Sequence, residues 1–145
     1  MYLGESIHIG GERYPMVGLF PYDFIMGKKP QGHGYTILEV VQDNPFFPQG
    51  AVLKGHEFHY SRMTPDPGPE AAMAFRVTRG AGIGGQREGL LYKNVLATYT
   101  HLHALGAPEW APAMVRKAME YQEVNRGTGQ PAAPPEEALA LGARG

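Results

Sequence analysis

The sequence has 145 residues, enough for one domain with a hydrophobic core and too few for two. The formal net charge of −1 gives no electrostatic reason to bind nucleic acid or an anionic membrane surface. No apolar run approaches the roughly 20 residues of a membrane helix, and no basic leader followed by an apolar stretch opens the sequence, so we expect a cytoplasmic location.

The absence of cysteine restricts the chemistry further. Without cysteine, these residues can form no disulfide, no zinc–thiolate site and no thiolate nucleophile of their own. The 20 glycines and 13 prolines favour a loop-rich β or α/β domain over a helical bundle.

The first part of the sequence predicts short extended segments separated by turns. Residues 1–7 are predicted as one helical turn or an extended start, and Gly10-Gly11 as a turn. A strand is predicted over Tyr14–Leu19 and an irregular loop over Pro21–Pro30. A stronger strand is predicted over Gly34–Gln42, which is rich in β-branched and aromatic residues.

The middle of the sequence predicts the main sheet. We expect its central strand over Val52–Ser61. Three prolines within Thr64–Pro69 exclude a helix or central strand there, because proline lacks a backbone donor and has a fixed φ. Ala72–Thr78 alternates as a strand, and Gly89–His103 is predicted as one long strand or two consecutive ones.

One helix is predicted, over Pro108–Val124. Glu109 near its start is favourable at the positive end of the helix dipole. Four residues recur on one face, which we expect to pack in the core: Trp110, Met114, Ala118 and Tyr121. From Arg126 to Gly145 the composition shifts to Gly, Pro, Ala and Glu, which predicts a flexible tail after a domain of residues 1–125.

Two short motifs resemble sites that their surroundings disfavour. The run Gly80–Gly85 satisfies G-x-G-x-x-G after a predicted strand, but a dinucleotide site needs a helix to begin there, and another strand follows. We therefore predict a hairpin loop. The run Gly4–His8 differs from a serine nucleophile elbow, because His8 replaces the final glycine, so Ser6 is not predicted to be a nucleophile.

The segment KGHEFHYS, residues 54–61, concentrates titratable side chains on a predicted strand, which indicates an unusual sheet surface or a site. Strand alternation divides it into two faces: His56, Phe58 and Tyr60 on one, and Glu57, His59 and Ser61 on the other. The two histidines therefore point apart, which disfavours a metal chelate within the segment. The alternative is a buried hydrogen-bond network on the second face.

His101 and His103 share a face with Tyr99 if their strand is regular. That arrangement could place a general base beside an orienting partner, the geometry that activates a nucleophile. The alternative is two histidines at a strand end that have satisfied hydrogen bonds and no chemical role.

Four stretches together resemble one family. They are MYLGESI from Met1, Gly34-Tyr35, KGHEFHYS from Lys54, and YKNVLATYTHLHA from Tyr92. In order and spacing over residues 1–118 they resemble the C-terminal glutamine amidotransferase domain of the cobyrinic acid a,c-diamide synthases. Near relatives are the siroheme-amidating proteins of sulfur metabolism and the nickel-sirohydrochlorin diamide synthases, and the run ATYTHLHALGAPEWA looks more like the siroheme-amidating kind.

The resemblance implies an α/β fold of three layers with a mixed sheet, similar to class I glutamine amidotransferases. In such enzymes a cysteine thiolate, assisted by a histidine, attacks the amide of glutamine, and the ammonia reaches a tetrapyrrole carboxylate that a separate ATP-binding domain activates. His101 matches the assisting histidine, and His103, Glu57 and His59 are supporting candidates. His103 stands where many class I enzymes carry a glutamate. The family uses ATP and Mg with glutamine as nitrogen donor, and we expect no cofactor within this chain.

In the family, the nucleophile lies in a Cys-Gly-Gly segment a few residues ahead of the MYLGES run, where this sequence begins. We therefore expect a truncated domain without the cysteine, its strand and the ATP-binding domain, unable to hydrolyse glutamine or form an amide alone. A missing strand leaves backbone groups and an apolar face uncovered. We therefore expect the chain to aggregate or to recruit a partner, either the missing ATP-binding part or another copy.

Three functions remain open from the sequence. The first is a piece of a tetrapyrrole amidotransferase, active only when another polypeptide supplies the cysteine and the ATPase. The second is a non-catalytic binding or partner subunit that keeps a pocket for a tetrapyrrole or a synthetase. The third is an unrelated β-rich protein whose histidines hold a metal. For none of these do we expect nucleic acid or a membrane as partner.

Overall fold

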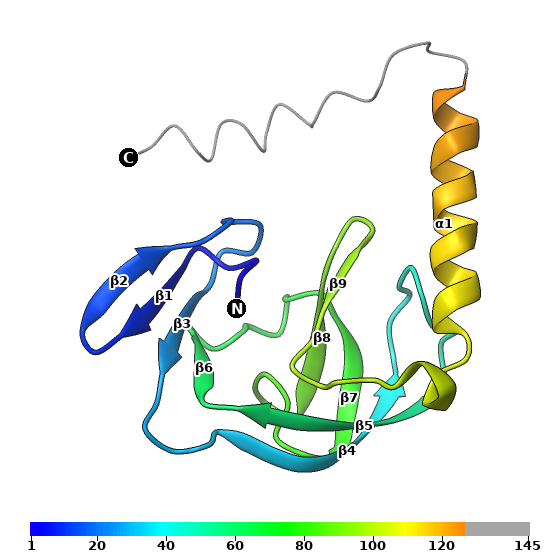
Figure 1. Ribbon diagram of the computed structural model, residues 1–145. Helices are drawn as coiled ribbons and strands as arrows, with labels where there is room; N and C mark the ends of the chain where they lie inside the picture. The colour runs from blue at the N-terminus through cyan, green and yellow to red at the C-terminus, as the bar shows by residue number, and fades with distance from the viewer. Residues whose placement is uncertain (127–145) are drawn as a thin grey trace.

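Strands dominate the structure, a computed structural model that describes residues 1–126 (Figure 1). Within these residues the chain forms nine strands, one 3-10 helix and one α-helix. In chain order they are β1 (Ser6–Ile9), β2 (Glu12–Pro15), β3 (Asp23–Met26), β4 (Gly32–Val40), β5 (Val52–His59), β6 (Ser61–Thr64), β7 (Met73–Arg79), β8 (Arg87–Tyr92), β9 (Val95–Ala97), η1 (Ala104–Gly106) and α1 (Trp110–Asn125). The predicted tail lies outside the described residues from residue 127 onward, so it stays a prediction.

The first sheet has the strand order β2-β1-β3-β6 and is mixed. β1 is antiparallel to β2 and parallel to β3, and β3 is antiparallel to β6. Gly10 and Gly11, with φ angles of 63° and 93°, form the predicted turn between β1 and β2, a left-handed conformation that glycine adopts without steric cost. The expectation of an α/β domain with a mixed sheet is confirmed.

The second sheet has the order β5-β4-β7-β8-β9 and is antiparallel throughout. The predicted central strand Val52–Ser61 is wrong in position and extent, because β5 lies at the edge of this sheet and ends at His59. After Tyr60 the chain continues as β6, which belongs to the first sheet. The KGHEFHYS segment thus passes from one sheet to the other, which brings the two sheets together at the candidate site.

Two further predictions need correction. The predicted loop Pro21–Pro30 contains β3, and the predicted strand Tyr14–Leu19 is extended only to Pro15, in β2. β3 has just four residues, and its pairing with β1 and β6 stabilises it as a strand. The strands predicted over Gly34–Gln42 and Ala72–Thr78 are confirmed as β4 and β7.

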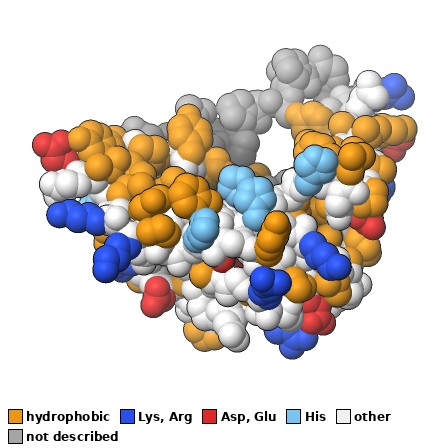
Figure 2. Space-filling model, turned by 60° about the horizontal axis from the view of Figure 1, so that its bottom comes forward, with side chains coloured by type: hydrophobic (Ala, Val, Ile, Leu, Met, Phe, Trp, Pro, Cys, Tyr) orange, Lys and Arg blue, Asp and Glu red, His pale blue; other side chains and the backbone are white. Residues whose placement is uncertain are grey.

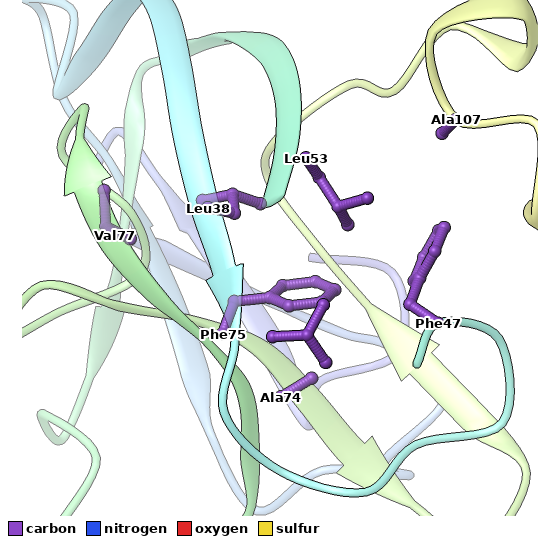
Figure 3. Packing of buried hydrophobic residues seen from close by; sticks show 8 residues of the cluster. Leu38, Phe47, Leu53, Ala74, Phe75, Val77 and Ala107 are labelled. Atoms are coloured by element: carbon purple, nitrogen blue, oxygen red, sulfur yellow. The ribbon is translucent and has the colours of Figure 1, made fainter. Parts of the chain in front are cut away.

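Two hydrophobic clusters hold the sheets. The first lies on the second sheet (Figure 3) and contains Leu38, Val40, Phe47, Leu53, Ala74, Phe75, Val77 and Ala107. The second cluster joins the sheets, since Phe24 and Met63 of the first pack with Met73 and Leu90 of the second. Tyr99 belongs to this second cluster, so the chain segment that leads to His101 is packed between the two sheets.

The predicted helix is confirmed as α1, which projects away from the sheets (Figure 1). The prediction that one of its faces packs in the core is wrong. All four residues of that face, Trp110, Met114, Ala118 and Tyr121, are exposed, and the only buried residue of the helix is Ala113. Among the described residues, no helix is long and apolar enough to cross a membrane.

Candidate functional site

His101 lies where the chain returns from β9 to the edge strand β5. The His101 backbone N donates to the His56 carbonyl at 2.7 Å, and the His56 backbone N donates to the His101 carbonyl at 3.2 Å. The two imidazole rings lie side by side, with centroids 4.9 Å apart and planes tilted by 34°. Both residues are exposed. The backbone thus holds two residues with solvent-accessible imidazoles side by side, and an accessible imidazole is the side chain that most often serves as a general acid or base.

Gly55 permits the close approach of the His101 segment to β5. A β-carbon at position 55 would lie 2.5 Å from the His101 carbonyl oxygen and 2.6 Å from Cγ2 of Thr100. Because the nearer atom belongs to the backbone, a change of side-chain rotamer cannot relieve this contact. The glycine in KGHEFHYS is therefore needed for the bridge between His56 and His101.

Replacing Gly55 with alanine is expected to push the His101 segment away from β5 and to lower the free energy of unfolding by about 2 kcal/mol. Urea denaturation measures the change. Gly106→Ala is the matched control, because a β-carbon added there meets no atom within 4 Å, and we expect an effect below about 0.5 kcal/mol. Equal losses in the two variants would contradict the role given to Gly55.

The opposite face of β5 carries the buried network that alternation predicts. Glu57, His59 and Ser61 are 3%, 8% and 0% exposed. The Ser61 and Tyr99 hydroxyls form a hydrogen bond of 2.5 Å, and burial raises the pKa of Tyr99 to about 12. The His59 ring stacks on the Tyr99 ring at 3.9 Å between centroids, and its Nδ1 donates to the Ser61 carbonyl at 2.9 Å. These contacts fix Tyr99, two residues before His101.

Glu57 is bound by the glycine-rich loop between β7 and β8. Its carboxylate accepts hydrogen bonds from the backbone N of Ala81 at 2.6 Å and of Gly82 at 3.1 Å. Gly80 and Gly82 have φ angles of 118° and 69°, and such left-handed backbone turns successive N–H groups toward one anion. The predicted hairpin loop is confirmed: the run that matches G-x-G-x-x-G holds a carboxylate of its own chain.

Glu57→Gln is expected to lower the free energy of unfolding by about 2 kcal/mol, since an amide group cannot accept both charge-assisted hydrogen bonds. Glu123→Gln, on the exposed surface of α1, should change it by less than about 0.5 kcal/mol. Urea denaturation of the two variants side by side tests this. If Glu57→Gln were as stable as the control, the loop would not depend on this carboxylate.

Glu88, on β8, is a second buried carboxyl, which sequence reasoning missed. It is 0% exposed, and its Oε1 accepts hydrogen bonds from the backbone N of Gly89 at 3.0 Å and of Tyr99 at 3.1 Å. Burial is the main cause that raises the pKa of Glu88 to about 7. The only signal in the sequence is a glutamate directly before the apolar run of a predicted strand. Glu88 thus holds the backbone of Tyr99, while His59 and Ser61 contact its side chain.

His103 has a different role in the structure from the one that a regular strand implies. Its Nδ1 accepts a hydrogen bond from the backbone N of Leu105 at 3.2 Å and caps η1. Of the two alternatives predicted for Gly89–His103, two consecutive strands are confirmed as β8 and β9, but strand structure ends at Ala97 and residues 98–103 form no further strand. Tyr99 is buried in this segment, whereas His101 and His103 are exposed. The two histidines therefore do not share a face with Tyr99, as they would in a regular strand. The ring beside His101 is that of His56, which the sequence did not single out as its neighbour.

Ser6, His8 and Asp23 also contact one another, but not as a nucleophilic triad. The Ser6 hydroxyl donates to Asp23 and lowers the pKa of that carboxyl. The same ring nitrogen of His8, Nε2, lies 3.1 Å from the Ser6 hydroxyl and 3.5 Å from the Asp23 carboxylate. In a nucleophilic triad the serine and the acid contact different nitrogens of the histidine, so this arrangement is not a triad. Ser6 is buried within β1, which agrees with the rejection of a serine elbow.

No group of three or more His, Cys, Asp or Glu side chains within residues 1–126 is placed to hold a metal ion. His56 is exposed and His59 is buried, so the two point to opposite faces of β5, as alternation predicts. Exposed histidines also include His33, and Figure 2 shows histidine side chains gathered on one face of the molecule among hydrophobic ones.

Two cavities lie beside the segment that precedes His101. One, of about 290 Å³, is lined by residues that include Phe46, Thr100 and Trp110. The other, of about 380 Å³, is lined by residues 1–4 together with residues 96–99. The first residues of the chain therefore lie across a cavity from the residues that lead to His101.

Comparison with known proteins gives one consistent result. Residues 1–109 match the CobB/CobQ-like glutamine amidotransferase domain, which confirms the resemblance. The chain is 39% identical over 116 residues to the cobyrinate a,c-diamide synthase of Magnetococcus marinus, covering 80% of the chain and 25% of that protein. The cobyrinate a,c-diamide synthases of Methanosphaera stadtmanae and Archaeoglobus fulgidus are 38% and 39% identical over 120 residues, covering 83% of the chain and 26% of each protein. The chain thus spans about a quarter of the length of these curated relatives.

Proposed function

Because the chain belongs to the family of CobB/CobQ-like glutamine amidotransferase domains, we propose that it is part of an enzyme that amidates carboxylates of a tetrapyrrole, with glutamine as nitrogen donor. His101 is the residue to which we assign activation of the nucleophile. The observation that carries this assignment is the exposed His101 ring, fixed against β5 by two backbone hydrogen bonds. The adjoining residues 96–99 share a cavity with residues 1–4.

The proposed chemistry requires a thiolate. The His101 imidazole takes the proton of a thiol, the thiolate attacks the side-chain amide carbon of glutamine, and His101 returns the proton to the departing ammonia. Water then cleaves the thioester to release glutamate. The 145 residues contain no cysteine, so we assign the thiol to a part of the enzyme outside them and expect these residues alone to release no ammonia. ATP with Mg, which would activate the acceptor carboxylate, is likewise assigned to the part of the relatives that this chain does not match.

Ammonia release from glutamine tests the proposal. It is measured for the purified chain alone, and for the chain mixed with the Magnetococcus marinus cobyrinate a,c-diamide synthase from which the matching region has been deleted. We expect no release by the chain alone and release by the mixture. Release by the chain alone would refute the need for an external thiolate. Cobyrinate and siroheme-type tetrapyrroles are the acceptors to assay, since ATYTHLHALGAPEWA resembles the siroheme-amidating kind.

The absence of cysteine also supports a second function, that of a non-catalytic partner subunit in tetrapyrrole biosynthesis. Such a subunit would associate with a full-length synthase without binding glutamine. Co-purification with the synthase, together with calorimetry against glutamine, distinguishes the two functions. A mixture that forms a stable complex but releases no ammonia would favour the partner subunit.

A further inference from the structure

His56 has no step of its own in the proposed reaction, although its ring lies beside the His101 ring. The centroids of the two imidazole rings are 4.9 Å apart, and both residues are exposed. Imidazole is the commonest metal ligand among side chains, because a ring nitrogen of neutral histidine has a free electron pair. Two adjacent, accessible imidazoles are therefore a candidate site for a metal ion.

The backbone makes these two side chains neighbours. Each residue donates its backbone N–H to the carbonyl of the other, at 2.7 and 3.2 Å, which is the pattern of residues directly opposite each other in an antiparallel pair. Side chains at such positions lie on the same face, with β-carbons about 5 Å apart. Since Gly55 permits this close approach, the pair is held together at its backbone, and only side-chain torsions need to be ordered when a ligand binds.

The spacing of the rings matches that of two imidazoles on one ion. Zn²⁺ binds an imidazole nitrogen at about 2.1 Å, which places the ion about 3.2 Å from the centre of the ring. Two rings that bind one ion at an angle of about 90° to 110° therefore have centroids about 4.5 to 5.2 Å apart. The separation of 4.9 Å lies within this range. Because both side chains are exposed, rotation about their side-chain bonds can turn one nitrogen of each ring toward a common ion.

This is the only pair of histidines with adjacent rings in the part of the chain that the structure describes, which contains all six histidines. The His33 ring packs against Phe58 instead, at 5.3 Å between centroids, and Nδ1 of His103 caps η1. No third histidine, cysteine, aspartate or glutamate of residues 1–126 completes a larger set, so water would fill the remaining positions of a bound ion. Such a site is open to solvent and holds its ion reversibly.

We propose that His56 and His101 bind one Zn²⁺, or a related first-row transition-metal ion, between their imidazole rings. Mg²⁺ and Ca²⁺ prefer oxygen ligands, so the pair does not bind them. The site itself does not depend on the proposed function, but its consequence does. Neutral imidazole has a single free electron pair, so a His101 ring that binds the ion cannot take the proton of a thiol, and the ion inhibits the proposed reaction.

Isothermal titration calorimetry of the full chain without a histidine tag, with Zn²⁺ from about 1 µM to about 1 mM, tests the site. We expect one ion per chain. His56→Ala and His101→Ala are each expected to weaken binding at least about tenfold, because the second imidazole of the intact pair binds at a high effective concentration. A large excess of Mg²⁺ should not compete.

His33→Ala and His103→Ala are the matched controls, since each removes an exposed histidine outside the pair and should leave Zn²⁺ binding unchanged. Circular dichroism checks that each variant keeps the fold. The site is overturned if the wild type shows no saturable binding in this range, or if His56→Ala or His101→Ala binds Zn²⁺ as tightly as the wild type. It is also overturned if either control loses as much affinity as the variants of the pair.

Nuclear magnetic resonance of the wild-type chain tests the site without any substitution. As Zn²⁺ is added to protein with labelled histidine, the ring signals of His56 and His101 should shift together, before those of the other histidines. Shifts that begin at any other histidine would overturn the site.

Inhibition is measured on the mixture of the chain and the deleted synthase. His56→Ala should need at least about tenfold more Zn²⁺ for half-inhibition than the wild type, and the thiol of the partner is the same in both mixtures. Equal sensitivity to Zn²⁺ would overturn the inhibitory role. If the mixture releases no ammonia, the proposed function fails, while the binding measurements on the chain alone still decide the site.

Discussion

Replacing His101 with alanine is expected to reduce ammonia release about a thousandfold once a thiolate-bearing partner completes the site. The physical reason is that the proposed chemistry needs an imidazole, and the backbone bridge to His56 holds His101, whose ring is exposed, two residues after the segment 96–99 that shares a cavity with residues 1–4. Without it, no group at this position would take the proton of the thiol or return it to ammonia. Steady-state rates of the chain combined with the deleted synthase measure the loss.

His103→Ala is the matched control for this experiment. Its ring caps η1 through the backbone N of Leu105, so we expect less than a tenfold decrease in rate. His56→Ala removes the ring beside His101 while the backbone bridge remains, and its effect should lie between the other two. If His103→Ala were as inactive as His101→Ala, the role assigned to His101 alone would be wrong.

Glu88→Gln is expected to make the protein more stable at pH 8 by about 3 kcal/mol, while near pH 4.5 the variant and the wild type should be equally stable. Burial raises the pKa of Glu88 from 4.5 to about 7, so the folded protein binds a proton more tightly at this site than the unfolded chain does. The wild type therefore loses stability as the pH rises from about 4.5 to about 7, where the buried carboxyl becomes ionised. Glutamine resembles the neutral carboxyl and keeps an acceptor oxygen for Gly89 and Tyr99.

Urea denaturation of both proteins between pH 4.5 and pH 8 measures this effect, and the difference between the two curves isolates residue 88 from other titrating groups. The sign is diagnostic, because an ordinary ion-paired carboxylate contributes stability that grows with pH. A difference that does not change with pH, or a variant less stable at pH 8 than the wild type, would contradict the raised pKa.

The sequence by itself determined the features that depend on neighbouring residues. The turn at Gly10-Gly11, the hairpin loop at Gly80–Gly85 and the helix near Pro108–Val124 follow from glycine conformations and helix signals within a few residues. The alternation of KGHEFHYS also separated the exposed His56 from the buried Glu57 and His59. The family followed from the same residues, because their order and spacing are specific.

Only the tertiary structure decided the features that depend on residues far apart in the sequence. β3 is a strand because β1 pairs with one of its sides and β6 with the other. β5 is an edge strand because β4 is its only neighbouring strand in the sheet. The neighbour of His101 is His56, across 45 positions of sequence, because Gly55 leaves room for a backbone bridge. Helical periodicity showed which residues of α1 share a face, but whether that face meets the core depends on where the helix leaves the sheets. Burial and pairing are properties of the assembled sheets, so no local pattern could specify them.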